Sequence, residues 1–183
     1  MKANFSITTR KGDRGTTGTL GGEILSKAHP RIEACGLLDE LVSALGLARA
    51  TAGRRALGRA LLDIQRTVFT LAAEISAGAK SPSYLKPLDA VAVRKLDARR
   101  RALEKSLEPV RVFIVPGETV LGAHLDLARV AVRRCERAVV ALMERGEFRN
   151  PQALIWLNRL SDLLWLMARQ AEGHSRPLVE TKP

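Results

Sequence analysis

An arginine-rich segment at residues 123–145 offers the clearest potential for binding chemistry. It reads AHLDLARVAVRRCERAVVALMER, and its periodicity predicts one long helix. A guanidinium presents paired planar donors that match phosphate or carboxylate oxygens. A row of them could bind a polyanion, but a solvated helix face has the same composition. The residues expected on this polar side are Arg129, Arg133, Glu136 and Arg137, and those expected on the buried side are Leu127, Ala128, Ala131, Cys135, Ala138 and Val139.

A glycine- and threonine-rich segment at residues 7–22 is the second candidate. Its sequence is ITTRKGDRGTTGTLGG. Repeated glycine lets backbone N–H groups turn inward around an anion, and threonine, arginine and lysine side chains add donors. The GxxxxGK[ST] signature of a P-loop is absent. The segment is therefore either a phosphate-binding loop or a flexible N-terminal arm. A third candidate is the last helix, where Asn158 and Asp162 share a face.

Length and composition limit the class of protein to which these residues belong. The chain has 183 residues, of which 46% are hydrophobic and 4% aromatic. This predicts one domain with a core of leucine, alanine and valine. No apolar run reaches the roughly 18–20 residues of a membrane span, and the N-terminus lacks the apolar core of a signal peptide. We expect a cytoplasmic protein of bacterial type.

The net charge of +11 favours polyanionic partners, which include nucleic acid, nucleotides and acidic membranes. Binding of single-stranded nucleic acid would call for aromatic residues among the basic ones, and the chain has few. The three histidines show no metal-binding spacing, so no protein-ligated transition metal is expected. Cys35 and Cys135 are expected to be buried free thiols.

Hydrophobic periodicity predicts five helices, and their short connections indicate an all-α, mostly antiparallel bundle. A short extended piece, VRVFIVP, should be too isolated to nucleate a sheet. The expected organisation is a single domain, with an N-terminal loop at 1–30, the helices at 31–173 and a loose polar tail at 174–183. The expected helices cover residues 30–50, 54–77, 88–107, 123–145 and 151–171.

Taken together, these segments resemble the PduO-type ATP:cob(I)alamin adenosyltransferases, also called corrinoid adenosyltransferases. The motifs occur in the family's order over most of the chain, from about Thr9 to Arg169. They are TRKGDRGTTGTLGG followed by Ser26-Lys27, EACGLLDELVSALG, IQRTVFTLAAEI, FIVPG, LARVAVRRCERAV and WLNRLSDLLWLMAR.

The resemblance implies a five-helix homotrimer with active sites between subunits, which transfers the 5′-deoxyadenosyl group of ATP to cob(I)alamin and releases triphosphate. It implies Mg²⁺ with the ATP, and no nucleic-acid or membrane partner; a reductase and a downstream cobalamin enzyme are possible partners. Asp39 of one subunit would pair with Arg129 of the next, Phe113 would lie beneath the corrin ring, and Arg133 would serve catalysis. The implied ATP contacts are Thr9, Arg10, Lys11, Gly12, Thr17, Gly18, Lys27, Arg133, Arg134, Glu136, Arg137 and Asn158.

The sequence also departs from the family pattern. Lys11 stands at a usual Thr or Ser, Glu118 at a usual glycine, Asp126 at a frequent His and Cys135 at a common Ala. The tail lacks an aromatic residue, which leaves open whether it closes over the corrinoid. Two alternatives remain, the first motivated by these departures and the second by the net charge of +11. One is a non-catalytic relative that binds ATP or carries cobalamin, and the other is a basic helical module that binds nucleic acid or a protein.

Overall fold

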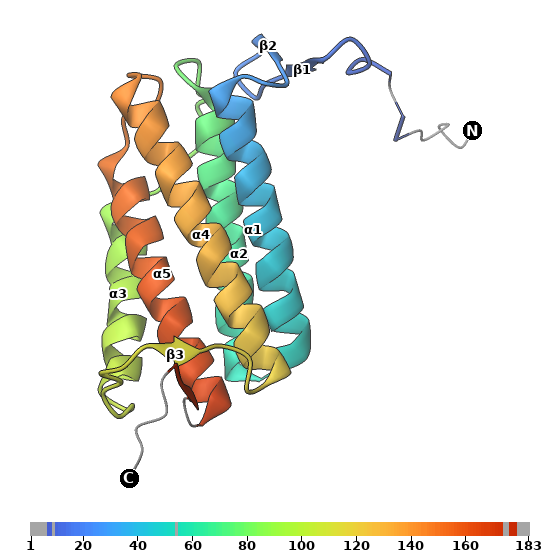
Figure 1. Ribbon diagram of the computed structural model, residues 1–183. Coiled ribbons are helices and arrows are strands. Elements are labelled where there is room, and N and C mark those ends of the chain that lie inside the picture. The colour runs from blue at the N-terminus through green and yellow to red at the C-terminus, as the bar shows by residue number, and fades with distance from the viewer. Residues whose placement is uncertain (1–6, 9, 54, 174–175, 179–183) are drawn as a thin grey trace, which may run out of the picture.

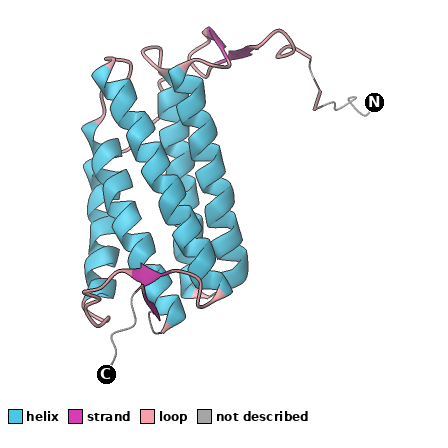
Figure 2. Cartoon of the chain, viewed as in Figure 1, coloured by secondary structure: helices cyan, strands magenta, loops and turns pink. Residues whose placement is uncertain are grey.

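The computed structural model describes residues 7–8, 10–53, 55–173 and 176–178, and within them it shows five helices (Figures 1 and 2). Successive helices run in opposite directions along one bundle (Figure 1). This confirms the predicted all-α five-helix architecture. The helices are α1 Pro30–Ala52, α2 Ala56–Ala77, α3 Ala90–Glu104, α4 Val120–Glu144 and α5 Pro151–Glu172.

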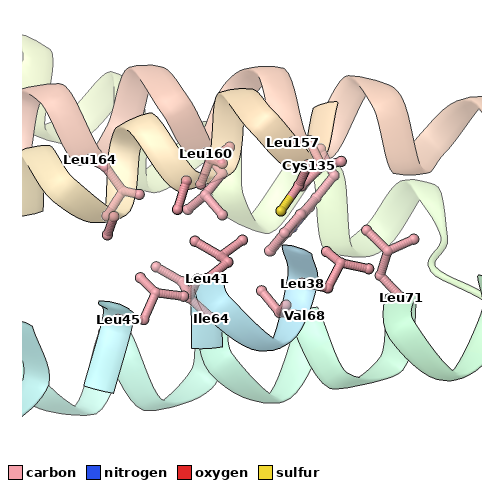
Figure 3. Packing of buried hydrophobic residues seen from close by; sticks show 14 of the residues in the cluster. Leu38, Leu41, Leu45, Ile64, Val68, Leu71, Cys135, Leu157, Leu160 and Leu164 are labelled. Carbon is pink, nitrogen blue, oxygen red and sulfur yellow. The ribbon is translucent and has the colours of Figure 1, made fainter. Parts of the chain in front are cut away.

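Helix α4 lies at the centre of the arrangement, because it packs against both α1 and α5. The outer contacts are those of α2 with α1 and of α3 with α5. In Figure 3, leucines of α1 and branched residues of α2 face Cys135 of α4 and leucines of α5. The labelled residues in this layer are Leu38, Leu41, Leu45, Ile64, Val68, Leu71, Cys135, Leu157, Leu160 and Leu164, all buried. The core thus consists mainly of leucine, alanine and valine, as predicted.

Helix ends follow local capping chemistry, which moves several predicted boundaries. Asp89 and Asn150 accept backbone N–H groups at the starts of α3 and α5. Thr119 caps α4 by accepting the Gly122 N–H at 3.0 Å. Helix α4 therefore begins at Val120, one turn before the predicted Ala123, and the arginine-rich face is carried on a longer helix.

The described part of the chain also contains four short strands that were not predicted. Strands β1 (Thr16–Gly18) and β2 (Ile24–Ser26) form an antiparallel hairpin inside the N-terminal segment. Strand β3 (Ile114–Val115) pairs with β4 (Arg176–Pro177), which belongs to the tail. The expectation that VRVFIVP is too isolated for a sheet was wrong, because its partner lies about 60 residues later in the chain.

The buried face of α4 also differs from the prediction at one position. Leu127 is 52% exposed, although its periodicity placed it in the core. Leu47 of α1 and Val130 of α4 are similarly exposed. Because α1 and α4 pack together, these side chains leave apolar surface on the outside of the bundle.

Both cysteines are free thiols. The Cys135 thiol is buried and donates to the Leu37 carbonyl at 3.2 Å, so it bridges α4 and α1. Burial raises its pKa to about 12. The Cys35 thiol is only half-buried and donates to the Ala72 carbonyl, and burial raises its pKa as well.

Within the described part of the chain, no helix combines the length and the apolar character needed to cross a membrane.

Candidate active site

Two arginines one turn apart define the centre of the polar face of α4. Arg133 and Arg137 are exposed. Among the described residues, neither side chain makes a hydrogen bond or ion pair. Within the described ranges, no acidic side chain compensates their positive charges, and both guanidiniums offer donors to a ligand.

Interhelical contacts hold the surface on both sides of this pair. Arg134 forms an ion pair with Glu40 of α1, with 2.6 Å between Nη1 and Oε1. On the other side, the Asn158 amide of α5 donates to the Glu136 carboxylate at 3.0 Å. The second of these contacts brings together residues that the resemblance assigns to one ATP site. Arg133 and Arg137 thus lie on a surface that Arg134 connects to α1 and Glu136 connects to α5.

Arg129 lies nearer the start of α4 and is partly buried. Its Nε donates to the Asp126 carboxylate at 2.8 Å, which leaves the two Nη groups for another partner. Asp39, its expected partner, is exposed on α1 and borders an apolar groove between α1 and α2 of about 460 Å³. Among the described residues, the Asp39 carboxylate makes no hydrogen bond or ion pair. Within one chain, Asp39 and Arg129 are not paired.

The N-terminal segment folds into a compact hairpin whose backbone is tightly turned. Asp13 and Gly15 donate to the Arg10 and Gly12 carbonyls, and Arg10 adopts a positive φ of 57°. The Lys27 backbone N–H donates to the Gly15 carbonyl at 2.8 Å. A Cβ placed on Gly12 would lie 3.0 Å from the Lys27 ammonium, so the absence of a side chain at Gly12 lets this charge lie over the loop.

A buried arginine attaches the hairpin to the bundle. The Arg31 guanidinium donates to the carbonyls of Ile75 and Ser76 at the end of α2, at 3.1 and 2.7 Å. It also pairs with Glu23 of the hairpin at 2.6 Å, and this hydrogen bond lowers the pKa of the Glu23 carboxyl. The Leu20 N–H adds a bond to the Ser76 hydroxyl at 3.1 Å. The hairpin therefore has a fixed position at the end of α2.

Phe113 is found at the opposite end of the bundle, just before β3 (Figure 1). Its side chain is 84% exposed, and its carbonyl accepts the Leu178 N–H from the tail at 2.7 Å. Val112 and Leu178 are also exposed. The tail, expected to be loose, is hydrogen-bonded to this segment at residues 176–178.

The structure therefore places the sequence-predicted residues in three separate groups. One is the α4–α5 face, the second is the hairpin with Arg10 to Lys27, and the third is the Phe113 end. Thr9 lies outside the described residues. Among the described contacts, none joins Arg10–Lys27 to α4 by a hydrogen bond or ion pair. The hairpin and the Phe113 segment lie at opposite ends of the bundle (Figure 1).

Several residues that organise these groups were missed in the sequence. Glu23, Arg31 and Ser76 dock the hairpin, and Arg169 and Glu172 form a buried ionic cluster with Asp126. No motif spacing connects them, because the Leu20–Ser76 and Asp126–Arg169 contacts span 56 and 43 residues. Two charged residues in otherwise apolar turns of α5 were the available signal. No cluster of three or more potential metal ligands occurs within the described ranges.

Comparisons with known proteins point to one family. The family model described as cobalamin adenosyltransferase matches residues 7–171. A corrinoid adenosyltransferase of Citrobacter freundii is 34% identical over 171 residues, covering 92% of this chain and 96% of its own. The corrinoid adenosyltransferase PduO of Salmonella typhimurium is 36% identical over 96% of this chain, which spans about half (53%) of that longer relative.

A solved structure shows the same fold. It is a variant of a PduO-type ATP:corrinoid adenosyltransferase from Lactobacillus reuteri, in complex with cobalamin and ATP. The TM-score is 0.86 at 31% identity, and the match covers 96% of this chain and all of that one.

Proposed function

The chain belongs to the cobalamin adenosyltransferase family, and on that basis we propose that it transfers the 5′-deoxyadenosyl group of ATP to cob(I)alamin. The products are adenosylcobalamin and triphosphate. The observation that carries the proposal is the uncompensated pair Arg133 and Arg137 on the face that also holds Glu136 and Asn158. Such a face is suited to a triphosphate, which is a large polyanion.

The reaction explains why the site is rich in donors rather than in acids and bases. The cobalt of cob(I)alamin supplies the electron pair that forms the bond to C5′ of ATP. The C5′–O bond breaks, and its electrons leave with the triphosphate, so no proton has to move. The protein's task is to hold the leaving group in line with the attack and to stabilise its charge.

We assign that task to Arg133, Arg137 and Lys27. The two arginines offer planar forks to the phosphate oxygens. Lys27 lies over the loop at Gly12, where backbone N–H groups and threonine hydroxyls add further donors. The loop would hold the nucleotide while the arginines receive the triphosphate.

Mg²⁺ fits the donors that are present. Mg²⁺ is commonly held by one or two carboxylates together with substrate phosphates, and the chain has no clustered metal ligands within its described ranges. We infer that the ion enters with ATP and that Glu136 is the carboxylate nearest to it on the α4 face. The Mg²⁺ ion would neutralise part of the negative charge of the triphosphate.

We further propose a homotrimer whose sites lie between subunits. The lack of any hydrogen bond or ion pair between the hairpin and α4 among the described residues supports this. The exposed apolar residues Leu47, Leu127 and Val130 offer an interface beside Arg129. In such an interface, the unpaired Asp39 of one subunit would meet the free Nη groups of Arg129 from the next.

Phe113 has a different proposed role. Its ring is apolar and offers no lone pair to cobalt, and it stands exposed at the end of the bundle. Placed beneath the corrin ring, it would exclude a lower axial ligand. Cobalt(II) without axial ligands is easier to reduce to the nucleophilic cobalt(I) state.

The test is an anaerobic assay of the purified chain with ATP, Mg²⁺ and chemically reduced cob(I)alamin. The absorbance change to the alkylcobalamin is followed, and the inorganic product is identified. We expect adenosylcobalamin and intact triphosphate in equal amounts. ATP binding without turnover would favour a non-catalytic relative. Tight, steeply salt-dependent binding of random DNA or RNA without turnover would instead favour the basic binding module suggested by the +11 charge.

A further inference from the structure

A buried ionic cluster lies between α4 and the end of α5. Asp126, Arg169 and Glu172 are 5%, 4% and 5% exposed. Charged groups in such positions are costly unless they are paired and hydrogen-bonded. Arg169 also stacks on Trp165, with its guanidinium carbon 5.7 Å from the ring centre. None of these side chains is used by the mechanism proposed above.

The contacts of the cluster form a continuous path. The Asp126 carboxylate accepts from Arg129 Nε at 2.8 Å and from Arg169 Nη2 at 2.5 Å. The same Arg169 nitrogen lies 3.1 Å from Glu172 Oε2 as an ion pair. Glu172 Oε1 then accepts the backbone N–H of Gly117 at 3.2 Å. Arg129, assigned to the site, is thereby linked to the segment that carries Phe113.

The backbone around Gly117 is shaped to reach Glu172. Gly117 adopts a φ of 113°, a left-handed conformation that favours glycine. Thr119, two residues later, caps α4 and contacts the Ala171 carbonyl. On α4, a Cβ at Gly122 would lie 2.7 Å from Glu172 Cγ, so only glycine leaves room for this carboxylate. The fit therefore depends on two glycines from different elements.

We propose that Asp126, Arg169 and Glu172 are positioning residues for the adenosyl transfer. Glu172 fixes the end of the Phe113 segment, and Arg169 and Asp126 connect that anchor to Arg129. The cluster sets the position of Phe113 relative to the corrinoid and couples it to the Arg129 contact. The catalytic consequence of this inference rests on the proposed function. The anchoring of the Phe113 segment by Glu172 does not rest on it.

Two variants test the anchor in different ways. Glu172→Gln retains the shape but has one acceptor in place of two, so it cannot serve both Arg169 and Gly117. Gly122→Ala keeps every charge and adds a good helix former to α4, yet its methyl group displaces Glu172. Glu144→Gln, an exposed carboxylate near the end of α4, is the matched control.

The first readout is amide hydrogen exchange of residues 113–117 in the protein without substrates. Loss of one hydrogen bond should speed exchange at Gly117 by about tenfold in both variants and leave the control unchanged. Unchanged exchange in both folded variants would overturn the anchor. If Glu172→Gln does not fold, Gly122→Ala alone decides the question.

The second readout is catalysis. We expect the KM for corrinoid to rise, or kcat to fall, by on the order of tenfold to a hundredfold, while the KM for ATP stays within about twofold. The absorbance spectrum of cob(II)alamin bound with ATP should shift back toward a cobalt that keeps an axial ligand. Equal changes for ATP and corrinoid, or a wild-type spectrum, would refute the positioning role. A wild-type chain without turnover would instead overturn the proposed function, leaving the exchange result to stand.

Discussion

Arg133 and Arg137 differ from the other arginines of their helix in having no acidic partner among the described residues. Arg129 and Arg134 are matched by Asp126 and Glu40. Helical periodicity predicts that Arg129, Arg133 and Arg137 project from one side of α4. It does not show which arginines of the helix have an acidic partner. That distinction depends on α1 and on local i, i+3 geometry. It is also what separates a triphosphate-binding pair from an ordinary solvated face.

Arg133→Ala should lower kcat/KM by about a hundredfold to a thousandfold, since a donor to the leaving group's charge is lost. The fold should be unaffected because the side chain is exposed. Arg145→Ala, which removes the same charge from the exposed end of α4, is the control. Steady-state kinetics and circular dichroism of both variants provide the measurement. Equal losses in the two variants would indicate a general charge effect.

Asp39→Ala should weaken corrinoid use more than ATP binding. The exposed carboxylate is proposed to pair with Arg129 of a neighbouring subunit, and this pair is proposed to serve the corrinoid rather than ATP. Glu33→Ala, also exposed on α1, serves as the control. Separate titrations of ATP and cob(I)alamin in the turnover assay give the two KM values. A matching rise in both would argue against the cross-subunit pair.

At the scale of elements, the long helices could be predicted and the short strands could not. A helix of about 20 residues repeats its apolar pattern over several turns, whereas β3 and β4 have two residues each and pair across the chain. The hairpin position likewise depends on Arg31. Its partners are the Ile75 carbonyl of α2 and the carboxylate of Glu23, the residue just before β2. Such long-range contacts leave no periodic signal in the sequence.

The docking of the hairpin should depend on pH through Glu23. Arg31 lowers the pKa of this carboxyl from its ordinary 4.5, so the ionised form stabilises the docked state. That contribution is complete above pH 4.5 and is lost as the pH falls through the lowered pKa. The amide resonance of Leu20, which is bonded to Ser76, should report this transition below pH 4.5.

Glu23→Gln should remove that titration and weaken ATP binding at neutral pH. Glu33→Gln changes an exposed carboxylate on α1 and should leave both properties intact. A Leu20 midpoint at or above 4.5, or the same titration in Glu23→Gln, would show that another group controls the docking.

At the scale of the whole molecule, the hairpin and the Phe113 segment lie at opposite ends of the bundle (Figure 1). The architecture of a five-helix domain was evident from composition and helix length. Leu127 was misassigned to the core because its spacing fits the buried stripe, while its side chain is half exposed, as are those of Val130 and Leu47. Periodicity reports that a face is apolar, but not whether the chain itself or a second copy covers it.

Mixed oligomers test this arrangement directly. Lys27→Ala impairs the loop and Arg133→Ala impairs the α4 face, so each alone should be nearly inactive. If loop and face come from different subunits of a trimer, co-expression should restore about a quarter of the sites. The control pair Arg133→Ala with Arg137→Ala places both defects on the same face and should restore none. No recovery in the first pair, with mixed trimers verified by mass, would place the site within one subunit.

The reactivity of the Cys135 thiol can report how often the helix bundle opens locally. It is sealed between α4 and the Leu37 carbonyl of α1, and burial raises its pKa to about 12, so almost no reactive thiolate exists in the closed bundle. An alkylating reagent can modify it only when those two helices part. The alkylation rate therefore measures how often α1 separates from the arginine-bearing helix, without any label being added to the chain.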